Sequence, residues 1–350
     1  MTKLGKLLIG AGLLALGTVS HASANMAEYF KDRTVTIIIP YGPGGTYDKY
    51  GASFAKHIGN FIPGKPTVIL QHMPGAGGAK AMIYTYNVAP KKGFHMVVPL
   101  DNLVVNQLLR PKRMKYKSDK FNYLGSSNQT NSVMAVRTDS GVNKWDDMKK
   151  ISIIGSSSGT NSSTFLMARL SSELLGLKIK MVTGYKGSSR AMMAMEQGES
   201  QMSSPNWLAW GSKVPHWFTG TREGKKGKPF AVAVLQNGFF KDPALPNTPM
   251  LTDLVSQKDK PLARFIASAG PLGRGLAYPP AMPSDLVNTM RTAYDKMNGS
   301  KKFVAELKKK KLRLIPTRGV EIQKIVEDTI KEASPAVISR VRKLIYGKTS

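Results

Sequence analysis

The chain has 350 residues, with 51 lysines and arginines against 22 aspartates and glutamates, and it contains no cysteine. The absence of cysteine excludes disulfides, thiolate catalysis, cysteine-bound zinc and an N-terminal lipid-bearing cysteine. The formal charge of +29 suggests an anionic partner, but the basic residues gather in loops and on helix faces without interleaved aromatic residues or a nucleic-acid motif. We therefore interpret them as solvated faces that attract anionic solutes, and we expect no nucleic-acid partner.

Residues 1–24 have the features of a bacterial signal peptide. Lys3 and Lys6 form a basic start, Leu7–Val19 is apolar, and Ala22–Ala24 supplies small residues for cleavage. The apolar run is shorter than the roughly 20 residues that a membrane-spanning helix needs. Removal of this segment lowers the charge from +29 to +27. We expect an exported periplasmic protein without a lipid anchor, whose mature chain of about 325 residues is long enough for two domains.

The stretch 34–57 begins the mature fold. Val35–Ile39 is a continuous apolar run, which predicts a buried parallel strand. Gly42–Gly45 then allows a tight turn with exposed amides, and a helical pattern follows, with Thr46 or Asp48 as its N-cap. The free N–H groups and the positive dipole end of that helix favour a bound anion.

The same order of strand, loop and helix recurs twice. Strands alternate with helices at short spacing, which predicts α/β architecture with parallel sheets covered by helices. Further strands are predicted at 67–71, 94–100, 123–125, 132–136, 151–154, 180–183 and 229–235, and helices at 79–87, 163–175, 286–297, 322–326 and 337–344. We expect two lobes joined by two crossing segments, with residues 25–131 and 263–350 in lobe 1 and residues 132–262 in lobe 2.

The third loop, residues 155–163, reads GSSSGTNSS and is rich in hydroxyl and amide donors. Together with the helix start that follows, it can bind a carboxylate without a buried arginine. Helix capping explains one or two of these residues but not the whole run. The two glycine-rich loops lack the lysine and hydroxyl of a phosphate-binding P-loop, so nucleotide binding is not expected, although each can be read simply as a tight strand–helix turn.

A serine hydrolase is the alternative function. Gly155–Gly159 matches G-x-S-x-G between a strand and a helix, with Ser157 as the nucleophile. The required base must be His216, because it is the only histidine downstream of Ser157, and no acid is clearly placed between them. His57, His72 and His95 are scattered without metal spacing, so we expect neither a metal nor a cofactor. A run rich in serine and glycine produces this motif easily by chance, so we favour a binding protein over an enzyme.

Five segments carry a family resemblance, and they are TVTIIIPYGPGGTYDKYGASFAKHI, MPGAGGAKAMIYTYNVAPKKGF, ISIIGSSSGTNSSTFLMARLSSELLG, VTGYKGSSRAMMAMEQGE and PALPNTPMLTDL. The chain resembles the tripartite tricarboxylate transporter receptors, the Bug or TctC-like periplasmic solute-binding proteins. The resemblance implies a type II periplasmic binding protein fold that closes on a small organic acid. It also implies a membrane permease of TctA/TctB type as the partner, and we expect a monomeric receptor.

The resemblance also implies which loops bind the ligand. In the family, the two glycine-rich loops hold one carboxylate, partly through ordered water, while the third loop contacts it from the other lobe and the stretch after Tyr185 adds contacts. The site residues carried over are Tyr41, Gly42, Gly44, Gly45, Thr46, Asp48, Pro74, Gly75, Ala76, Gly77, Gly78, Ser156, Ser157, Ser158, Gly159, Thr160, Asn161, Ser163, Tyr185, Lys186, Gly187 and Ser204.

The sequence departs from the family after Gly198, where acidic residues are common. Gln201 and Ser204 stand there instead, which argues against a ligand with an ammonium group. A dicarboxylate, a tricarboxylate or an aromatic acid remains. Lys186 can neutralise a second carboxylate or point to solvent. The tryptophans Trp207, Trp210 and Trp217 can line an aromatic pocket or pack in the core.

Overall fold

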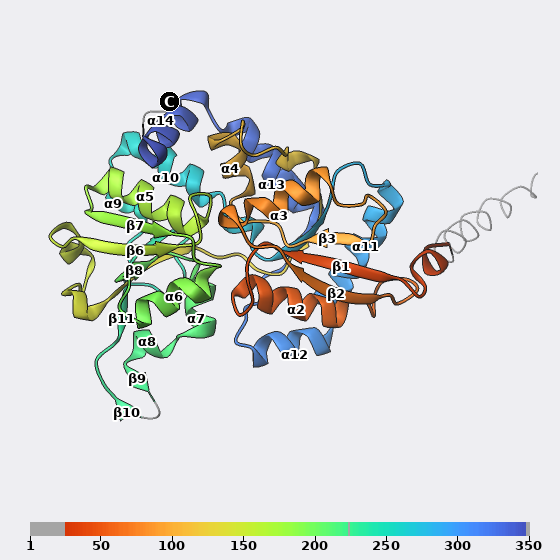
Figure 1. The fold of residues 1–350 in the computed structure, drawn as a ribbon, viewed down its shortest axis with the longest axis horizontal. Helices are drawn as coiled ribbons and strands as arrows, with labels where there is room; N and C mark the ends of the chain where they lie inside the picture. The colour runs from red at the N-terminus through yellow and green to blue at the C-terminus, as the bar shows by residue number, and fades with distance from the viewer. Residues whose placement is uncertain (1–24, 223–224, 348–350) are drawn as a thin grey trace, which may run out of the picture.

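The computed structural model describes residues 25–222 and 225–347, so the predicted signal peptide lies outside the described residues. The described chain forms two lobes, each a sheet covered by helices (Figure 1). The first sheet has the order β13-β4-β12-β3-β1-β2 and the second the order β11-β5-β8-β6-β7. The predicted two-lobed α/β fold is therefore confirmed.

The first sheet is mixed, because its central strand comes from the far end of the chain. β1 pairs in parallel with β2 and β3, whereas β12 is antiparallel to β3 and β4. Its strands are β1 (Thr34–Ile39), β2 (Thr67–His72), β3 (His95–Val97), β4 (Asn122–Ser126), β12 (Gly275–Tyr278) and β13 (Thr317–Arg318). Its helices are α2 (Thr46–Ile58), α3 (Ala79–Asn87), α4 (Leu103–Leu109), α11 (Ser284–Asn298), α12 (Lys301–Lys309) and α13 (Gly319–Glu332).

The second lobe contains the middle of the chain. Its strands are β5 (Ser132–Arg137), β6 (Ile153–Ser157), β7 (Ile179–Thr183), β8 (Met202–Ser203) and β11 (Ala231–Asn237), with a small hairpin of β9 (Thr221–Arg222) and β10 (Lys225–Lys226). Its helices are α5 (Ser163–Leu175), α6 (Ser188–Glu196), α7 (Trp207–Lys213), α8 (His216–Thr219), α9 (Leu251–Leu254) and α10 (Lys260–Ala267). The chain crosses between the lobes after β4 and again before β12, as two predicted crossings require.

The predicted division of the chain assigned residues 263–350 to lobe 1. The last helix, α14 (Pro335–Tyr346), packs instead against elements of the second lobe. Val341 and Ile345 are buried in one hydrophobic cluster with side chains of β5 and α5, and Phe265 of α10 belongs to the same cluster. The same cluster contains Leu109 of α4, so α14 lies over the second lobe and also contacts α4 (Figure 1). An amphipathic pattern predicts that a helix face is buried but not which lobe buries it.

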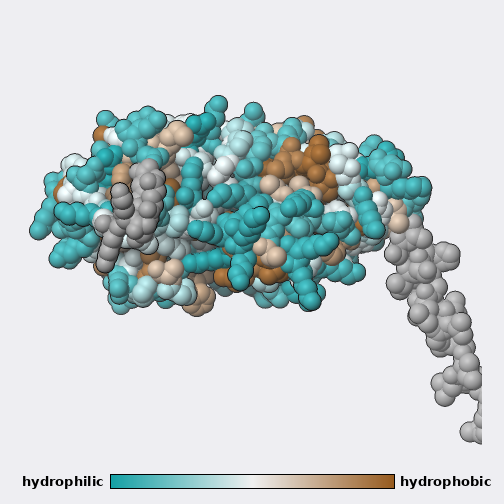
Figure 2. All heavy atoms as spheres, turned by 90° about the horizontal axis from the view of Figure 1, so that it is seen from below, coloured by the Kyte–Doolittle hydropathy of each residue, from teal (hydrophilic) through white to brown (hydrophobic). Residues whose placement is uncertain are grey.

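Hydrophilic residues cover most of the molecular face that Figure 2 shows. The tryptophans of the predicted aromatic pocket pack in the core instead of lining the cleft. Trp210 and Trp217 are buried in a separate aromatic cluster of the second lobe, where Trp207 packs against them, and none of the three lines the cavities between the lobes. Among residues 25–222 and 225–347, no helix combines the length and the apolar character needed to cross a membrane.

Candidate functional site

The ends of the two sheets that face each other enclose two adjoining hollows. The inner cavity has a volume of about 30 Å³ and is lined from both lobes, by Tyr41, Gly42, Pro43, Gly45, Thr46, Tyr47, Ser158, Ser162, Ser163, Thr164, Lys186, Gly187, Ser188, Ser189, Pro205, Asn206, Ala209 and Arg274. The outer hollow measures about 250 Å³ and is lined by Tyr41, Pro74, Gly75, Ala76, Gly77, Gly78, Ser158, Gly184, Tyr185 and Lys186. The two share Tyr41, Ser158 and Lys186, so they form one continuous cleft.

The first loop reaches the cleft because β1 ends at Ile39 and α2 begins at Thr46. Neither predicted N-cap residue caps α2, since Gly45 occupies that position without a side-chain hydrogen bond. Asp48 instead accepts a hydrogen bond from the Gly44 amide at 2.8 Å and lies 2.7 Å from His72. Asp48 and His72 line neither hollow, so these bonds hold the turn from outside the cleft, and the first residues of α2, Thr46 and Tyr47, line the inner cavity.

The second loop turns at Gly75–Gly78, where all three glycines have positive φ. The Tyr41 hydroxyl donates to the Gly77 carbonyl at 2.9 Å, which ties the second loop to the first. Burial raises the pKa of the Tyr41 phenol well above its ordinary value, and burial likewise raises the pKa of Tyr47. Both phenols therefore stay protonated near neutral pH and can act as hydrogen-bond donors.

The third loop starts later than predicted, because β6 extends to Ser157 and pairs with Thr183 of β7. Ser156 and Ser157 are consequently buried inside the second lobe. Ser156 donates to the Ala191 carbonyl, while the Ser157 hydroxyl has no hydrogen-bond partner among the described residues. The predicted loop thus contributes Ser158, Ser162 and Ser163 to the cavity, but not Ser156 and Ser157.

Other predicted site residues join the lobes without lining either hollow. Asn161 donates to the Ala76 carbonyl at 3.1 Å, and the Asn161 carbonyl accepts from Asn102 at 2.6 Å. Arg110 donates to Thr160 Oγ1 and to Asn161 Oδ1, both at 2.9 Å. The Cβ that an alanine would place at Gly159 would lie 2.7 Å from the Gly77 nitrogen, so the second and third loops touch backbone to backbone. The structure is therefore closed.

Two predicted residues flank the far side of the cavity. Gly187 lines it, and the Lys186 carbonyl accepts from the Gly42 amide of the other lobe at 2.9 Å. The Lys186 side chain is exposed. Ser204 is fully buried and donates to the Thr164 carbonyl at 2.8 Å, which fixes the start of α5 rather than a ligand. Neither Gln201 nor Ser204 lines the cavity, whereas their neighbour Asn206 does.

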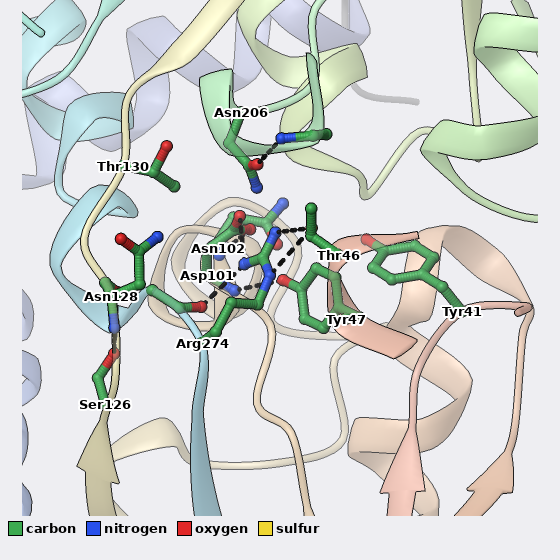
Figure 3. Close-up of polar contacts among 12 residues, drawn as sticks. Tyr41, Thr46, Tyr47, Asp101, Asn102, Ser126, Asn128, Thr130, Asn206 and Arg274 are labelled. Atoms are coloured by element: carbon green, nitrogen blue, oxygen red, sulfur yellow. Dashed lines mark hydrogen bonds and ion pairs between the residues drawn. The ribbon is translucent and has the colours of Figure 1, made fainter. Parts of the chain in front are cut away.

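The sequence reasoning missed several residues of the cavity lining, and Arg274 is the charged one among them, since that reasoning expected carboxylate binding without a buried arginine. It precedes β12 on the second crossing segment, and only 1% of it is exposed. Its guanidinium lies 3.6 Å from the Tyr47 ring centroid, donates to Thr46 Oγ1 and stands 3.5 Å from the Asp101 carboxylate (Figure 3). A lone arginine between two glycines, just before an apolar strand, was the available signal.

The site has no feature of a metal centre or of the alternative hydrolase. The described residues contain no group of three or more His, Asp or Glu that could hold a metal ion. Ser157, the predicted nucleophile, has its Oγ buried without a partner, while His216 starts α8 beside the aromatic cluster that contains Trp217. A serine nucleophile needs a base within hydrogen-bond reach, and no residue in 25–222 or 225–347 hydrogen-bonds to the Ser157 hydroxyl. The arrangement offers amide, hydroxyl and guanidinium donors, which can bind an anion.

Comparison with known proteins gives the same architecture. No family model matches the chain. It is 25% identical over 214 residues to the UPF0065 protein in the tcbD-tcbE intergenic region of Pseudomonas sp. strain P51, and this alignment spans 61% of that relative and 58% of this chain. It is 20% identical over 331 residues to a UPF0065 protein of Bordetella pertussis, with 93% of this chain and 95% of the relative covered.

The solved structures of similar fold include a periplasmic binding protein. The periplasmic binding protein BugD has a TM-score of 0.69 at 16% identity, covering 90% of this chain and 98% of its own. Rpa4515 of R. palustris, solved with adipate, and MatC of Rhodopseudomonas palustris, with bound malate, both have a TM-score of 0.67 at 18% identity, and each alignment covers 89% of this chain. Of those two structures, 97% and 99% respectively are covered. These findings confirm the resemblance to Bug and TctC proteins, and the chain has their periplasmic binding protein fold.

Proposed function

We propose that the protein is a periplasmic solute-binding receptor that binds a small organic carboxylate and delivers it to a membrane permease of TctA/TctB type. The observation that carries the proposal is the convergence of three strand–helix loops, from two lobes, on one cleft whose polar groups are hydrogen-bond donors. Adipate and malate in the structures of similar fold are small carboxylates of this kind. The predicted signal peptide supports export to the periplasm.

The closed state explains how binding is converted into a signal. An inner cavity of about 30 Å³ is far smaller than the roughly 300–1,000 Å³ of ordinary small-molecule sites. A ligand must therefore enter while the lobes are apart, and the lobes must close less tightly around it. Contacts to both lobes favour the closed form, and the permease reads that form.

A thermal-shift screen of the mature protein tests the proposal. The panel contains dicarboxylates, tricarboxylates, aromatic acids and their neutral amides. A ligand at 100 times its dissociation constant stabilises the folded state by roughly 2.7 kcal/mol, which raises the melting temperature measurably. We expect a shift with at least one acid and none with its amide. A panel without any shift would argue against a carboxylate receptor.

The hydrolase alternative is tested in parallel. An exported serine hydrolase would react with a fluorophosphonate probe at Ser157, and Ser157→Ala would abolish the labelling. Because the Ser157 Oγ is buried, we expect no labelling of the folded protein. Polyanion binding through the basic faces would instead appear as binding with little chemical selectivity and a steep dependence on salt.

A further inference from the structure

The inner cavity ends at a buried cation whose donors are not all used. Arg274 carries five N–H groups. Nε and Nη2 donate to Thr46 Oγ1 at 3.3 and 3.1 Å, and Nη1 donates to the Gly273 carbonyl at 2.8 Å. The Asp101 carboxylate lies 3.5 Å from Nη1, longer than the roughly 2.7–2.9 Å of a charge-assisted hydrogen bond. One Nη2 hydrogen thus has no acceptor within the described part of the chain, and the Asp101 counter-ion lies beyond close hydrogen-bond distance.

Asp101 is held by other contacts, which limit its pairing with Arg274. Its Oδ1 accepts from the Asn102 amide at 2.9 Å, and its own backbone amide donates to the Tyr47 hydroxyl at 3.0 Å. The Asp101 carboxylate thus balances the charge of Arg274, but it does not form the two close hydrogen bonds that the guanidinium can donate. A guanidinium binds a planar carboxylate best through two parallel hydrogen bonds, and that geometry is not used within the protein here.

Further polar groups surround the space above Arg274. Asn206 comes from the other lobe and uses its Oδ1 to accept from the Ala209 amide, while its Nδ2 is turned toward the guanidinium (Figure 3). Asn128, on the first crossing segment, is fully buried, and neither of its side-chain polar atoms has a partner among the described residues. In Figure 3 its side-chain amide points toward Thr130 and not toward the guanidinium, and Asn128 does not line the inner cavity. Unpaired buried polar atoms cost free energy unless a ligand or water satisfies them.

From these contacts we propose that Arg274 and Asn206 form a second anion subsite at the deep end of the cleft, so that the ligand is an acid with two carboxylates. This inference rests on the proposed function, in which the first carboxylate binds at the glycine-rich loops. The second carboxylate takes the free Nη2 hydrogen of Arg274 and the Asn206 amide, and the first remains near Tyr41 and Ser158, where the inner cavity meets the outer hollow. Lys186, the predicted partner of a second carboxylate, lies at that junction and is exposed, so water screens its charge.

The test compares acids of equal chain length that carry one or two carboxylates. Titration calorimetry on the mature protein uses succinate with butanoate, glutarate with pentanoate, and adipate with hexanoate. We expect at least one diacid to bind roughly tenfold or more tightly than its monoacid, because a hydrogen bond to a charged group contributes about 1.5–3 kcal/mol. Arg274→Gln should reduce that ratio to within about threefold, and Arg274→Lys should restore part of it.

Arg274→Gln leaves the Asp101 carboxylate buried without its cation, and this can prevent folding. The double variant Arg274→Gln/Asp101→Asn removes both charges, and it should fold and lose the preference for diacids. Arg190→Gln, which removes an exposed charge on α6 that does not line the cavity, is the matched control and should keep the ratio.

Three results would overturn the inference. The ratio could persist in the double variant, it could disappear in Lys186→Gln instead, or the wild-type protein could bind monoacids as tightly as diacids. Each leaves the proposed function intact, because carboxylates would still bind. Failure of every acid to bind the wild-type protein would overturn both the proposed function and this inference. Failure of the inference alone can therefore be distinguished from failure of the proposed function.

Discussion

Substitution of Gly77 by alanine should keep the lobes from closing. An added Cβ would lie 2.7 Å from the Ser162 nitrogen on the opposite lobe, against the 3.4 Å at which ordinary contact begins. The lobes must therefore move apart locally by about 0.7 Å. The 2.9 Å hydrogen bond from Gly42 to Lys186 and the 3.1 Å bond from Asn161 to Ala76 would then stretch beyond hydrogen-bond range.

Two lost hydrogen bonds correspond to about 2 kcal/mol, so the ligand affinity of Gly77→Ala should fall roughly 30-fold. The substitution also strains the backbone, because Gly77 has φ +66°. Gly176 separates the two effects, since it has the same φ of +66° but nothing within 4 Å of an added Cβ. Gly176→Ala should lose about 1 kcal/mol of stability and no affinity.

The assay combines calorimetric titration of an acid found in the screen with small-angle X-ray scattering of the ligand-bound protein. Gly77→Ala should bind weakly and keep a larger radius of gyration at saturation, while Gly176→Ala should match the wild type in both. Wild-type affinity and full compaction in Gly77→Ala would refute the view that the second and third loops are the closing contact.

Three further substitutions give distinct readouts. Arg110→Gln removes the bonds to Thr160 and Asn161, so it should lower ligand affinity roughly tenfold in calorimetry and leave the melting temperature of the ligand-free protein nearly unchanged. Asp101→Asn removes the anion that competes for Arg274 and should increase diacid affinity several-fold, but not that of monoacids. Glu306→Gln should cost about 2–3 kcal/mol in urea unfolding at pH 7, with less loss below pH 4.

The pH dependence of the stability that Glu306 contributes follows from its hydrogen-bond partners. Burial disfavours its charge, but hydrogen bonds from Lys310, Lys56, His57 and Ser53 outweigh burial and hold its pKa well below the usual range. A folded-state pKa below the unfolded value gives stability that is present above the unfolded pKa and lost as the pH falls through the folded one. The measurement compares the melting temperatures of the wild type and of Glu306→Gln between pH 6 and pH 3. A wild-type melting temperature that stayed constant over this range, with no compensating change in the variant, would contradict the low folded-state pKa of Glu306.

The first half of the site could be predicted from sequence because its signals are local. A continuous apolar run, a glycine turn and a helical pattern specify β1, the first loop and α2 within a few residues of one another. The start of the third loop was less accessible. Ser156 and Ser157 are polar, which favours a loop, yet they belong to β6 because Ser156 satisfies its hydroxyl on carbonyls of neighbouring segments inside the lobe.

Arg274 could not be assigned to the site from sequence because its surroundings are assembled from distant segments. Thr46 and Tyr47 come from α2, Asp101 follows β3, and Asn206 belongs to the other lobe. No spacing rule relates these positions, and an arginine in a loop is usually exposed. Only the order of strands in the first sheet, which inserts β12 between β4 and β3, brings the arginine to the cleft.

The position of Arg274 links anion binding to lobe closure. Its carbonyl accepts from the Ser127 amide at 2.7 Å and its own amide donates to the Asn128 carbonyl at 3.3 Å, so the two crossing segments are hydrogen-bonded to each other at this residue. The guanidinium is thus fixed at the hinge, whereas Asn206 moves with the second lobe. An anion held between them draws that lobe toward the hinge, while the surface charge of the protein acts only on the rate of encounter, because solvent and salt screen it. Selectivity for the ligand therefore depends on one buried cation, and the many exposed ones add little to it.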